Sequence, residues 1–458
     1  MSERMRQRLL VGLPLVLLGA FYAFLTTRIG VGVADGGPDE TARLLVPKAM
    51  LLGDLLPSGY NPVTVMNWPE YPYSGNYSYA FYPQLLGAYV TALFMFVARV
   101  LGAAPVWQLV AARLSSAAWG VAGAYFVGRT VRECLGEARN GYAYGAFATL
   151  LVGFWPQYAF ISSYVNNDVV GTAGVAMLVC ALVLGIRNGW NTRPCALLAV
   201  GIVVCALGYL NTYGFILAAI VTFVWTCVAQ HESDWRAAAR PIGLTALACA
   251  ACTFPFFGVN LVRYGDVIGS RVFEEQHLAW VAQGNEPLMR PYGESFWSLV
   301  LLDPFVSSTL QSFVGTFGYM SVTLPDAVRY FYWGTLLLGS GAFVGSAWLR
   351  RRCCSARWRI LVLSLLAGAA ITVALHVWRT LNADYQAQGR YIIGLLMPWC
   401  VLAALGIQRI FGRHSVALVL FAALYAVICV ATFAYLMWHF AWPGIFVGSQ
   451  DYLAMVIP

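Results

Sequence analysis

Two adjacent acids, Asp39 and Glu40, follow the first long apolar segment of the chain. Pro38 precedes them and apolar residues recur at helical spacing after them, which predicts a short amphipathic helix lying on a membrane surface. Carboxylates in the first turn of a helix can simply stabilise its positive end. The other interpretation is chemical, because a carboxylate held at a surface can remove a proton from a substrate hydroxyl. Asp39 and Glu40 are therefore candidate catalytic residues.

A third acid, Asp168, stands where another long apolar segment begins. An acid so close to a membrane is costly, so it is a candidate catalytic residue, with capping of a helix next to water as the alternative. Arg113 lies at the start of a further apolar segment. Its expected partner is Asp39 or Asp168, and a purely structural salt bridge is the alternative.

Basic residues at the depth of lipid headgroups are candidates for binding a phosphate. Arg390 begins an apolar segment, where its planar guanidinium can bind a phosphate or extend towards the headgroups of ordinary lipids. Arg113 is a further candidate for the same task, and Lys48, Arg43 and Arg263 are weaker ones.

The stretch 67–90 is rich in tyrosine, tryptophan, proline and asparagine. Such residues are typical of a membrane interface, but rings and amides also suit a hydroxyl-rich ligand such as a sugar. The predicted substrate-binding residues are Tyr82, Tyr79, Trp68, Asn167 and Gln388. His277 with Glu274 and Glu275 is not a metal signature and is read as part of a solvated helix. No metal ligand and no required cofactor are predicted, and dependence on a divalent metal stays open.

The elements that must position these residues are membrane helices. The chain of 458 residues is 60% hydrophobic and 10% charged, whereas soluble domains carry about 25% charged residues. Long uncharged runs recur from end to end, which is the signature of transmembrane helices. The net charge of +8 comes from arginines in the loops, so it does not indicate nucleic-acid binding.

The arginine distribution predicts the topology. If segment 81–102 does not cross the membrane, the short arginine-bearing loops all fall on the cytoplasmic side, as the positive-inside rule requires. The prediction is a single all-α domain over 1–458 that spans a bacterial inner membrane several times. Its N-terminus is expected in the cytoplasm and its C-terminus in the periplasm. Two long periplasmic loops are then predicted: 28–110, which contains the acidic pair, and 262–327. Eleven spans are predicted: 9–27, 111–128, 142–163, 168–186, 194–210, 213–229, 241–261, 328–349, 360–377, 391–408 and 415–438.

The order of these features resembles that of the GT-C membrane glycosyltransferases. The resemblance rests on the acidic pair, Tyr82-Pro83, Arg113 and Asp168, and it covers 39 to about 398. That superfamily includes protein O-mannosyltransferases and lipid A aminoarabinose transferases, and pilin arabinofuranosyltransferases are a weaker match. The resemblance implies a GT-C bundle of about eleven transmembrane helices with amphipathic periplasmic helices. It also implies that Asp39 is the catalytic base and that Arg390 faces the phosphate of the donor.

The predicted reaction moves a sugar from a polyprenyl phosphate to an acceptor hydroxyl on the periplasmic face. The phosphate leaves as a stable anion, so one base and cations suffice. The expected partners are the lipid-linked sugar, membrane lipids and an acceptor that is a glycan, a lipid or a protein such as pilin. The alternatives are a membrane polysaccharide polymerase or ligase, a transporter of a lipid-linked glycan, and a scaffold. Nearly charge-free span interiors count against the transporter.

Overall fold

The computed structural model describes residues 2–30, 37–68, 75–136, 140–232, 234–350, 355–412, 414–439 and 450–458. Most of this part of the chain is helical. Its only sheet pairs two short antiparallel strands, β1 (Thr316–Phe317) and β2 (Val322–Thr323). The prediction of an all-α, multi-pass membrane protein is therefore confirmed.

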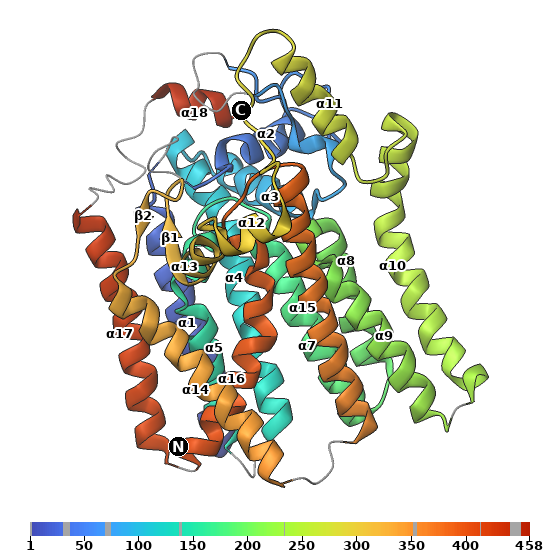
Figure 1. Ribbon diagram of the computed structural model, residues 1–458, viewed down its shortest axis with the longest axis vertical. Helices are drawn as coiled ribbons and strands as arrows, with labels where there is room; N and C mark the ends of the chain where they lie inside the picture. Colours follow the sequence, from blue (N-terminus) through green and yellow to red (C-terminus); the bar gives the residue numbers. More distant parts are fainter. Residues whose placement is uncertain are drawn as a thin grey trace.

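Long helices run side by side along the length of the molecule (Figure 1). They are α1 (Glu3–Thr26), α4 (Pro105–Leu135), α5 (Gly141–Gly153), α7 (Asp168–Asn188), α8 (Thr192–Gly208), α9 (Tyr213–Gln230), α10 (Trp235–Tyr264), α14 (Asp326–Arg350), α15 (Ala356–Asn382), α16 (Leu396–Phe411) and α17 (Ser415–His439). Seven helices in the described residues are long and apolar enough to cross a membrane by length and composition. The predicted number of eleven spans stays a prediction.

One predicted span is wrong in detail. Segment 142–163 is not a continuous helix, because α5 ends at Gly153 and the short α6 (Pro156–Ile161) follows. Pro156 is the first residue of α6, where its missing N–H costs nothing, whereas inside a continuous helix it would remove a hydrogen bond.

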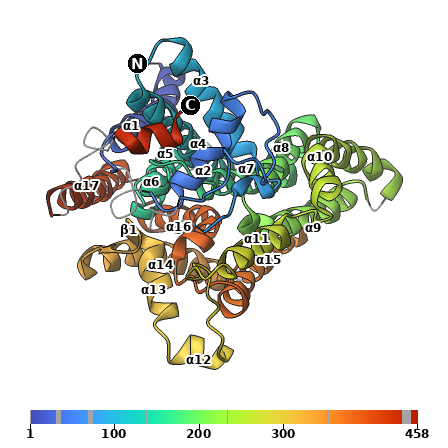
Figure 2. The same cartoon turned by 90° about the horizontal axis from the view of Figure 1, so that it is seen from above.

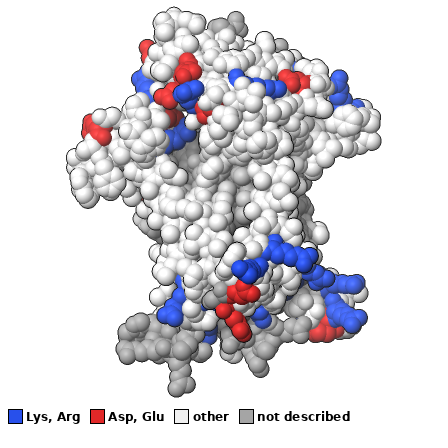
Figure 3. All heavy atoms as spheres, turned by 90° about the vertical axis from the view of Figure 1, so that its right-hand side faces the viewer, with Lys and Arg blue, Asp and Glu red and all other residues white. Residues whose placement is uncertain are grey.

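On one face of the molecule, the charged side chains gather at its two ends (Figure 3). Figure 3 shows basic and acidic residues at both ends of the face it presents, with a broad band free of charge between them. Such a band is what the hydrocarbon core of a bilayer requires, since charges there are costly.

At the centre of the bundle stands α7. Residues 168–186 are all buried, and α7 packs against α4 and α8. Small residues permit this close packing: a Cβ at Gly174 would lie 2.7 Å from the sulfur of Cys205. The first residue of this enclosed helix, Asp168, is consequently held at the middle of one end of the bundle.

The long segments 28–110 and 262–327 lie largely at that same end (Figure 1). The elements found there or leading to it are α2 (Glu40–Leu51), η1 (Tyr79–Phe81), α3 (Leu86–Val100), η3 (Leu210–Thr212), α11 (Ser270–Val281), α12 (Phe296–Leu301), α13 (Phe305–Gly315), η4 (Gly389–Leu395) and α18 (Gln450–Val456). Seen from above, α2 crosses the centre of the bundle (Figure 2).

The placement of α2 differs from the prediction. It is a short helix that begins after the acidic pair, but most of its residues are buried, so it does not lie exposed on a membrane surface. It packs between α3 and α18, where Nζ of Lys48 donates hydrogen bonds to the carbonyls of Ala454 and Met455. The C-terminal helix thus holds α2 in place.

The helix α3 runs antiparallel to the first half of α4. The hydroxyls of Thr91 and Ser115 are 2.8 Å apart, and only 101–104 connect the two helices. Since α3 ends level with the start of α4, segment 81–102 does not run the length of the bundle. That this segment does not cross the membrane stays a prediction from the arginine distribution.

Candidate active site

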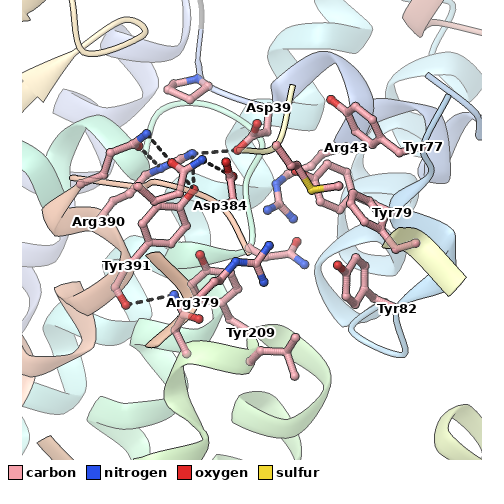
Figure 4. Close-up of a pocket in the computed structure, with 18 of the residues that line it drawn as sticks. Asp39, Arg43, Tyr77, Tyr79, Tyr82, Tyr209, Arg379, Asp384, Arg390 and Tyr391 are labelled. Atoms are coloured by element: carbon pink, nitrogen blue, oxygen red, sulfur yellow. Dashed lines mark hydrogen bonds and ion pairs between the residues drawn. The ribbon is translucent and has the colours of Figure 1, made fainter. Parts of the chain in front are cut away.

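A polar cavity of about 350 Å³ lies at the end of the bundle that α2 covers. Figure 4 shows tyrosines on one side of it, Arg390 and Tyr391 on the opposite side, and two further arginines between them. The charged residues that line it are Asp39, Arg43, Arg379, Asp384 and Arg390, and the tyrosines are Tyr77, Tyr79, Tyr82, Tyr209, Tyr319 and Tyr391.

Asp39 does not cap the helix that follows it. Its backbone is left-handed, with φ of 65°, and its side chain makes no capping hydrogen bond to α2. A non-glycine residue rarely adopts this conformation, although aspartate tolerates it better than most. The turn aims the carboxylate into the cavity, where Nη2 of Arg390 lies 2.9 Å from Oδ2. The capping interpretation is therefore wrong for Asp39.

Arg390 is shared between two acids. Besides Asp39, its Nη1 approaches Oδ2 of Asp168 at 3.8 Å, and its Nε donates to Oε1 of Gln388 at 2.7 Å. Asp168 is 1% exposed, so it is enclosed behind Arg390 and does not line the cavity. The fold thus joins residues that are 351 positions apart in the chain into one Asp39–Arg390–Asp168 cluster.

The charges around Asp39 determine its ionisation. Burial alone would raise the pKa of Asp39, but Arg390 and Arg43 outweigh it, so the pKa lies below its usual value. The carboxylate is accordingly ionised at neutral pH and can accept a proton, with its basicity reduced by the arginines.

The pH dependence of activity should reflect this. Because kcat/KM reports ionisations of the free enzyme, its acid side should stay flat from about pH 7 down to about pH 5, above the usual aspartate pKa of about 3.9. Initial rates at low substrate in a series of buffers check this. An acid limb with an apparent pKa near 6 that is absent from the Asp39→Glu variant would contradict it.

Two further arginines, Arg43 and Arg379, line the cavity. Arg43 stacks on the ring of Tyr79, with its guanidinium carbon 4.2 Å from the ring centre. Within the described ranges, neither Arg43 nor Arg379 forms an ion pair with a carboxylate. They are consequently the cations best placed to receive an anionic group. In the sequence, Arg43 is only a weaker candidate for binding a phosphate, and Arg379 is not a candidate.

A chain of amides and hydroxyls continues from Arg390 along the cavity wall. Oε1 of Gln386 accepts hydrogen bonds from Nε2 of Gln388 and from the hydroxyl of Tyr391. Nε2 of Gln386 in turn donates to Asp384. Burial raises the pKa of Asp384, in contrast to Asp39. This network fixes the side chains opposite the tyrosines.

Glu40, the second acid of the pair, faces away from the cavity. Its carboxylate forms a buried salt bridge with Arg113, with 2.6 Å between Oε2 and Nη2, and accepts a hydrogen bond from the amide of Val165. Arg113 also donates to three backbone carbonyls, those of Thr26, Ile29 and Gly30. The structural salt bridge is therefore the interpretation that holds, and the prediction that Arg113 pairs with Asp39 or Asp168 is wrong. All the donors of Arg113 are in use, so it is not placed to bind a phosphate.

The other predicted residues divide into two groups. Tyr79, Tyr82, Asn167 and Gln388 line the cavity. Lys48, Arg263 and Trp68 do not: Lys48 binds α18, Nη1 of Arg263 donates to the carbonyl of Leu56, and Trp68 packs on the cluster formed by Ala42, Leu45 and Met66.

His277 was expected on a solvated helix, but it is buried and lines the cavity, with Nε2 3.4 Å from the amide nitrogen of Met289. Its neighbours Glu274 and Glu275 are exposed, as expected. The described residues contain no cluster of three or more histidine, cysteine, aspartate or glutamate side chains that could hold a metal ion.

No protein-family model and no curated sequence matches the chain. The fold is similar to ArnT from Cupriavidus metallidurans, solved with undecaprenyl phosphate, at TM-score 0.51 and 16% identity, over 96% of this chain and 75% of ArnT. It is also similar to the Archaeoglobus fulgidus oligosaccharyltransferase, solved with Zn and sulfate, at TM-score 0.50 and 15% identity, over 92% of this chain. The chain spans about half (52%) of that second protein. The chain therefore shares its fold with these two solved proteins, which agrees with the resemblance found in the sequence.

Proposed function

We propose that the protein transfers a sugar from a polyprenyl-phosphate donor to the hydroxyl of an acceptor, with Asp39 as the base. The observation that carries this proposal is the composition of the cavity. It combines an ionised carboxylate, fixed by Arg390, with two arginines that have no acidic partner among the described residues. A base and cations for a departing phosphate are what this reaction needs.

A large apolar groove beside the cavity suits the polyprenyl tail. It has a volume of about 920 Å³ and lies among α12, α13, α14, α15 and η4–α16. Its wall includes Phe305, Leu310, Phe313, Trp333, Val373, Val377, Leu381 and Trp399. The neighbour ArnT, which was solved with undecaprenyl phosphate, supports a lipid of this class.

The last turns of α15 and the start of η4 lie between the groove and the cavity. Trp378 and Leu381 line the groove, while Arg379 lines the cavity. In the same way, Ile392 lines the groove and Tyr391 the cavity. A donor with its tail in the groove and its sugar in the cavity would therefore place its phosphate beside Arg379.

In the proposed reaction, the acceptor oxygen forms a bond to the anomeric carbon of the sugar. The bond from that carbon to the phosphate oxygen breaks, the acceptor proton passes to Asp39, and the electron pair leaves with the phosphate. Arg379 and Arg43 stabilise the negative charge that develops on the phosphate. Arg390, which the sequence suggested for that task, is instead proposed to orient Asp39 because it is already bound to two acids.

The tyrosines opposite Arg390 are proposed to bind sugar. Tyr79 and Tyr82 lie with ring centres 6.3 Å apart, and Phe273 packs 5.2 Å from Tyr82. Apolar ring faces beside hydroxyls and the amide of Asn167 suit a molecule that presents both C–H faces and hydroxyl groups.

We propose that the cavity faces the periplasm of a bacterial inner membrane. The opposite end of α4 contains Arg129 and Arg132, as the positive-inside rule expects of a cytoplasmic end. A reporter fused after Gly136 should therefore give a cytoplasmic signal, such as low phosphatase activity. A periplasmic signal at that position would contradict the orientation.

The donor site predicts the effect of changing Arg379. Arg379→Gln should raise the KM for a polyprenyl-phosphate sugar by about ten- to a hundredfold, because a charge-assisted hydrogen bond contributes roughly 1.5–3 kcal/mol. Arg271→Gln is the control, since Arg271 is exposed at the same end of the molecule. Kinetics of the purified variants measure both, and an unchanged donor KM in Arg379→Gln would remove this residue from the proposed phosphate site.

A further inference from the structure

Two polar side chains interrupt the apolar wall of the groove, Thr309 on α13 and His376 on α15. They are only 6% and 7% exposed. Oγ1 of Thr309 and Nε2 of His376 are buried and have no hydrogen-bond partner among the residues that the structure describes. A buried polar atom without a partner costs about 1–3 kcal/mol, so two of them in one groove require a physical reason.

Both residues lie at the part of the groove that borders the cavity. The His376 ring packs 5.6 Å from the ring of Tyr391, which lines the cavity, and 5.3 Å from Phe305, which lines the groove. Arg379 follows His376 by three residues on α15, so the two side chains are neighbours on the helix surface. His376 therefore lies at the boundary that the donor phosphate would occupy.

Thr309 reaches the same boundary from the other side. The start of η4 packs directly on α13, since a Cβ added at Gly389 would lie 2.5 Å from the carbonyl oxygen of Thr309. Gly389 immediately precedes Arg390, and its amide donates a hydrogen bond to Oγ of Ser312 on the next turn of α13. The contact between α13 and η4 thus brings Thr309 close to the residues that separate the groove from the cavity.

We propose that His376 and Thr309 are donor-binding residues that donate hydrogen bonds, through Nε2 and Oγ1, to the phosphate of the polyprenyl lipid. A neutral imidazole and a hydroxyl can each donate one such bond without bringing a charge into the membrane. The phosphate would then be held from the cavity by Arg379 and from the groove by His376 and Thr309. This inference rests on the proposed function. It adds two hydrogen bonds that favour binding of a phosphate whose lipid tail lies in the groove.

The test measures binding, so it does not depend on catalysis. Purified full-length protein is titrated with a polyprenyl monophosphate that carries no sugar. His376→Phe keeps an aromatic ring between Phe305 and Tyr391 but removes Nε2, and His376→Gln restores a polar nitrogen. Thr309→Val keeps the shape of the side chain and removes only the hydroxyl. We expect the Kd to rise about tenfold in His376→Phe and in Thr309→Val, and His376→Gln to recover part of the loss.

The outcomes separate the inference from the proposed function. If wild type binds the lipid and transfers sugar while His376→Phe and Thr309→Val bind equally well, the inference is wrong and the function stands. If wild type binds no polyprenyl phosphate, both fail. Phosphatidic acid should compete poorly, and competition equal to that of the polyprenyl lipid would also overturn the inference. Thr309→Val decides the matter if His376→Phe does not fold.

Discussion

Asp39→Asn should fold normally and lose nearly all sugar transfer. The change removes the proposed base but leaves an amide of the same size beside Arg390. General-base catalysis contributes about 10²- to 10⁴-fold, so turnover should fall by that factor while donor binding changes little. Arg390 keeps Asp168 as an ion-pair partner in this variant, and Asp39 makes no capping hydrogen bond to α2, so the loss of stability should be small. Turnover of a labelled lipid-linked sugar by the purified variant measures the effect.

Glu40→Gln is the matched control for this experiment. Glu40 is the adjacent residue, but its carboxylate is buried against Arg113 and does not line the cavity. Removing one partner of a buried salt bridge typically costs about 3–5 kcal/mol, so thermal stability should fall while the folded fraction keeps its turnover. The opposite pattern, with Asp39→Asn active and Glu40→Gln folded but inactive, would move the base to Glu40.

Arg390→Ala is expected to have the second largest effect, a loss of about a hundredfold or more in kcat together with reduced stability. The variant leaves Asp168 buried without its ion-pair partner and no longer holds Asp39 in place. Arg390→Lys should recover part of the activity only, because one ammonium group cannot contact Asp39, Gln388 and the Tyr391 hydroxyl in the same planar arrangement.

Steady-state kinetics distinguish the two roles considered for Arg390. A residue that positions the base lowers kcat and leaves the donor KM nearly unchanged. A residue that binds the phosphate of the donor raises that KM instead. Should Arg390→Lys show a raised donor KM with normal kcat, Arg390 would bind the phosphate, as the sequence alone predicted.

The sequence predicted the helical fold because membrane helices have a direct physical signature. Long apolar runs report the spans, and arginines in short loops indicate which ends share a side. That reasoning also led to Asp39, Asp168 and Arg390, since ionisable residues at the edge of a membrane are few and costly. The structure places these three together, although the first and last are 351 residues apart.

The roles within the acidic pair were not readable from the sequence. Asp39 and Glu40 are adjacent and chemically alike, and one left-handed backbone angle at Asp39 turns it towards the cavity while Glu40 faces Arg113. The position of α2, which Asp39 precedes, depends on its packing against α3, η1 and α18, and these contacts form only in the folded chain. An ion pair such as Glu40–Arg113 is also indistinguishable in sequence from a catalytic acid beside a phosphate-binding arginine.

Arg379 and Asp384 were missed for a similar reason. Arg379 follows a predicted span, where arginines usually extend towards lipid headgroups, and Asp384 lies in a short polar turn. Only the folded chain shows that the last turn of α15 separates a polar cavity from an apolar groove and that Arg379 lines the cavity. Lys48 and Arg263 were candidates for binding the phosphate in the sequence, yet in the structure their side chains donate hydrogen bonds to backbone carbonyls outside the cavity.

The most direct test of sugar transfer from a lipid donor uses purified protein in proteoliposomes. The protein is given a labelled polyprenyl-phosphate sugar together with a mixture of candidate acceptors, and in parallel a nucleotide sugar without the lipid. The proposed function predicts release of free polyprenyl phosphate and labelled product from the lipid donor, no reaction with the nucleotide sugar, and loss of both signals in Asp39→Asn. Transfer from the nucleotide sugar alone, or flipping of an unreacted lipid-linked sugar that Asp39→Asn leaves intact, would contradict the proposed function.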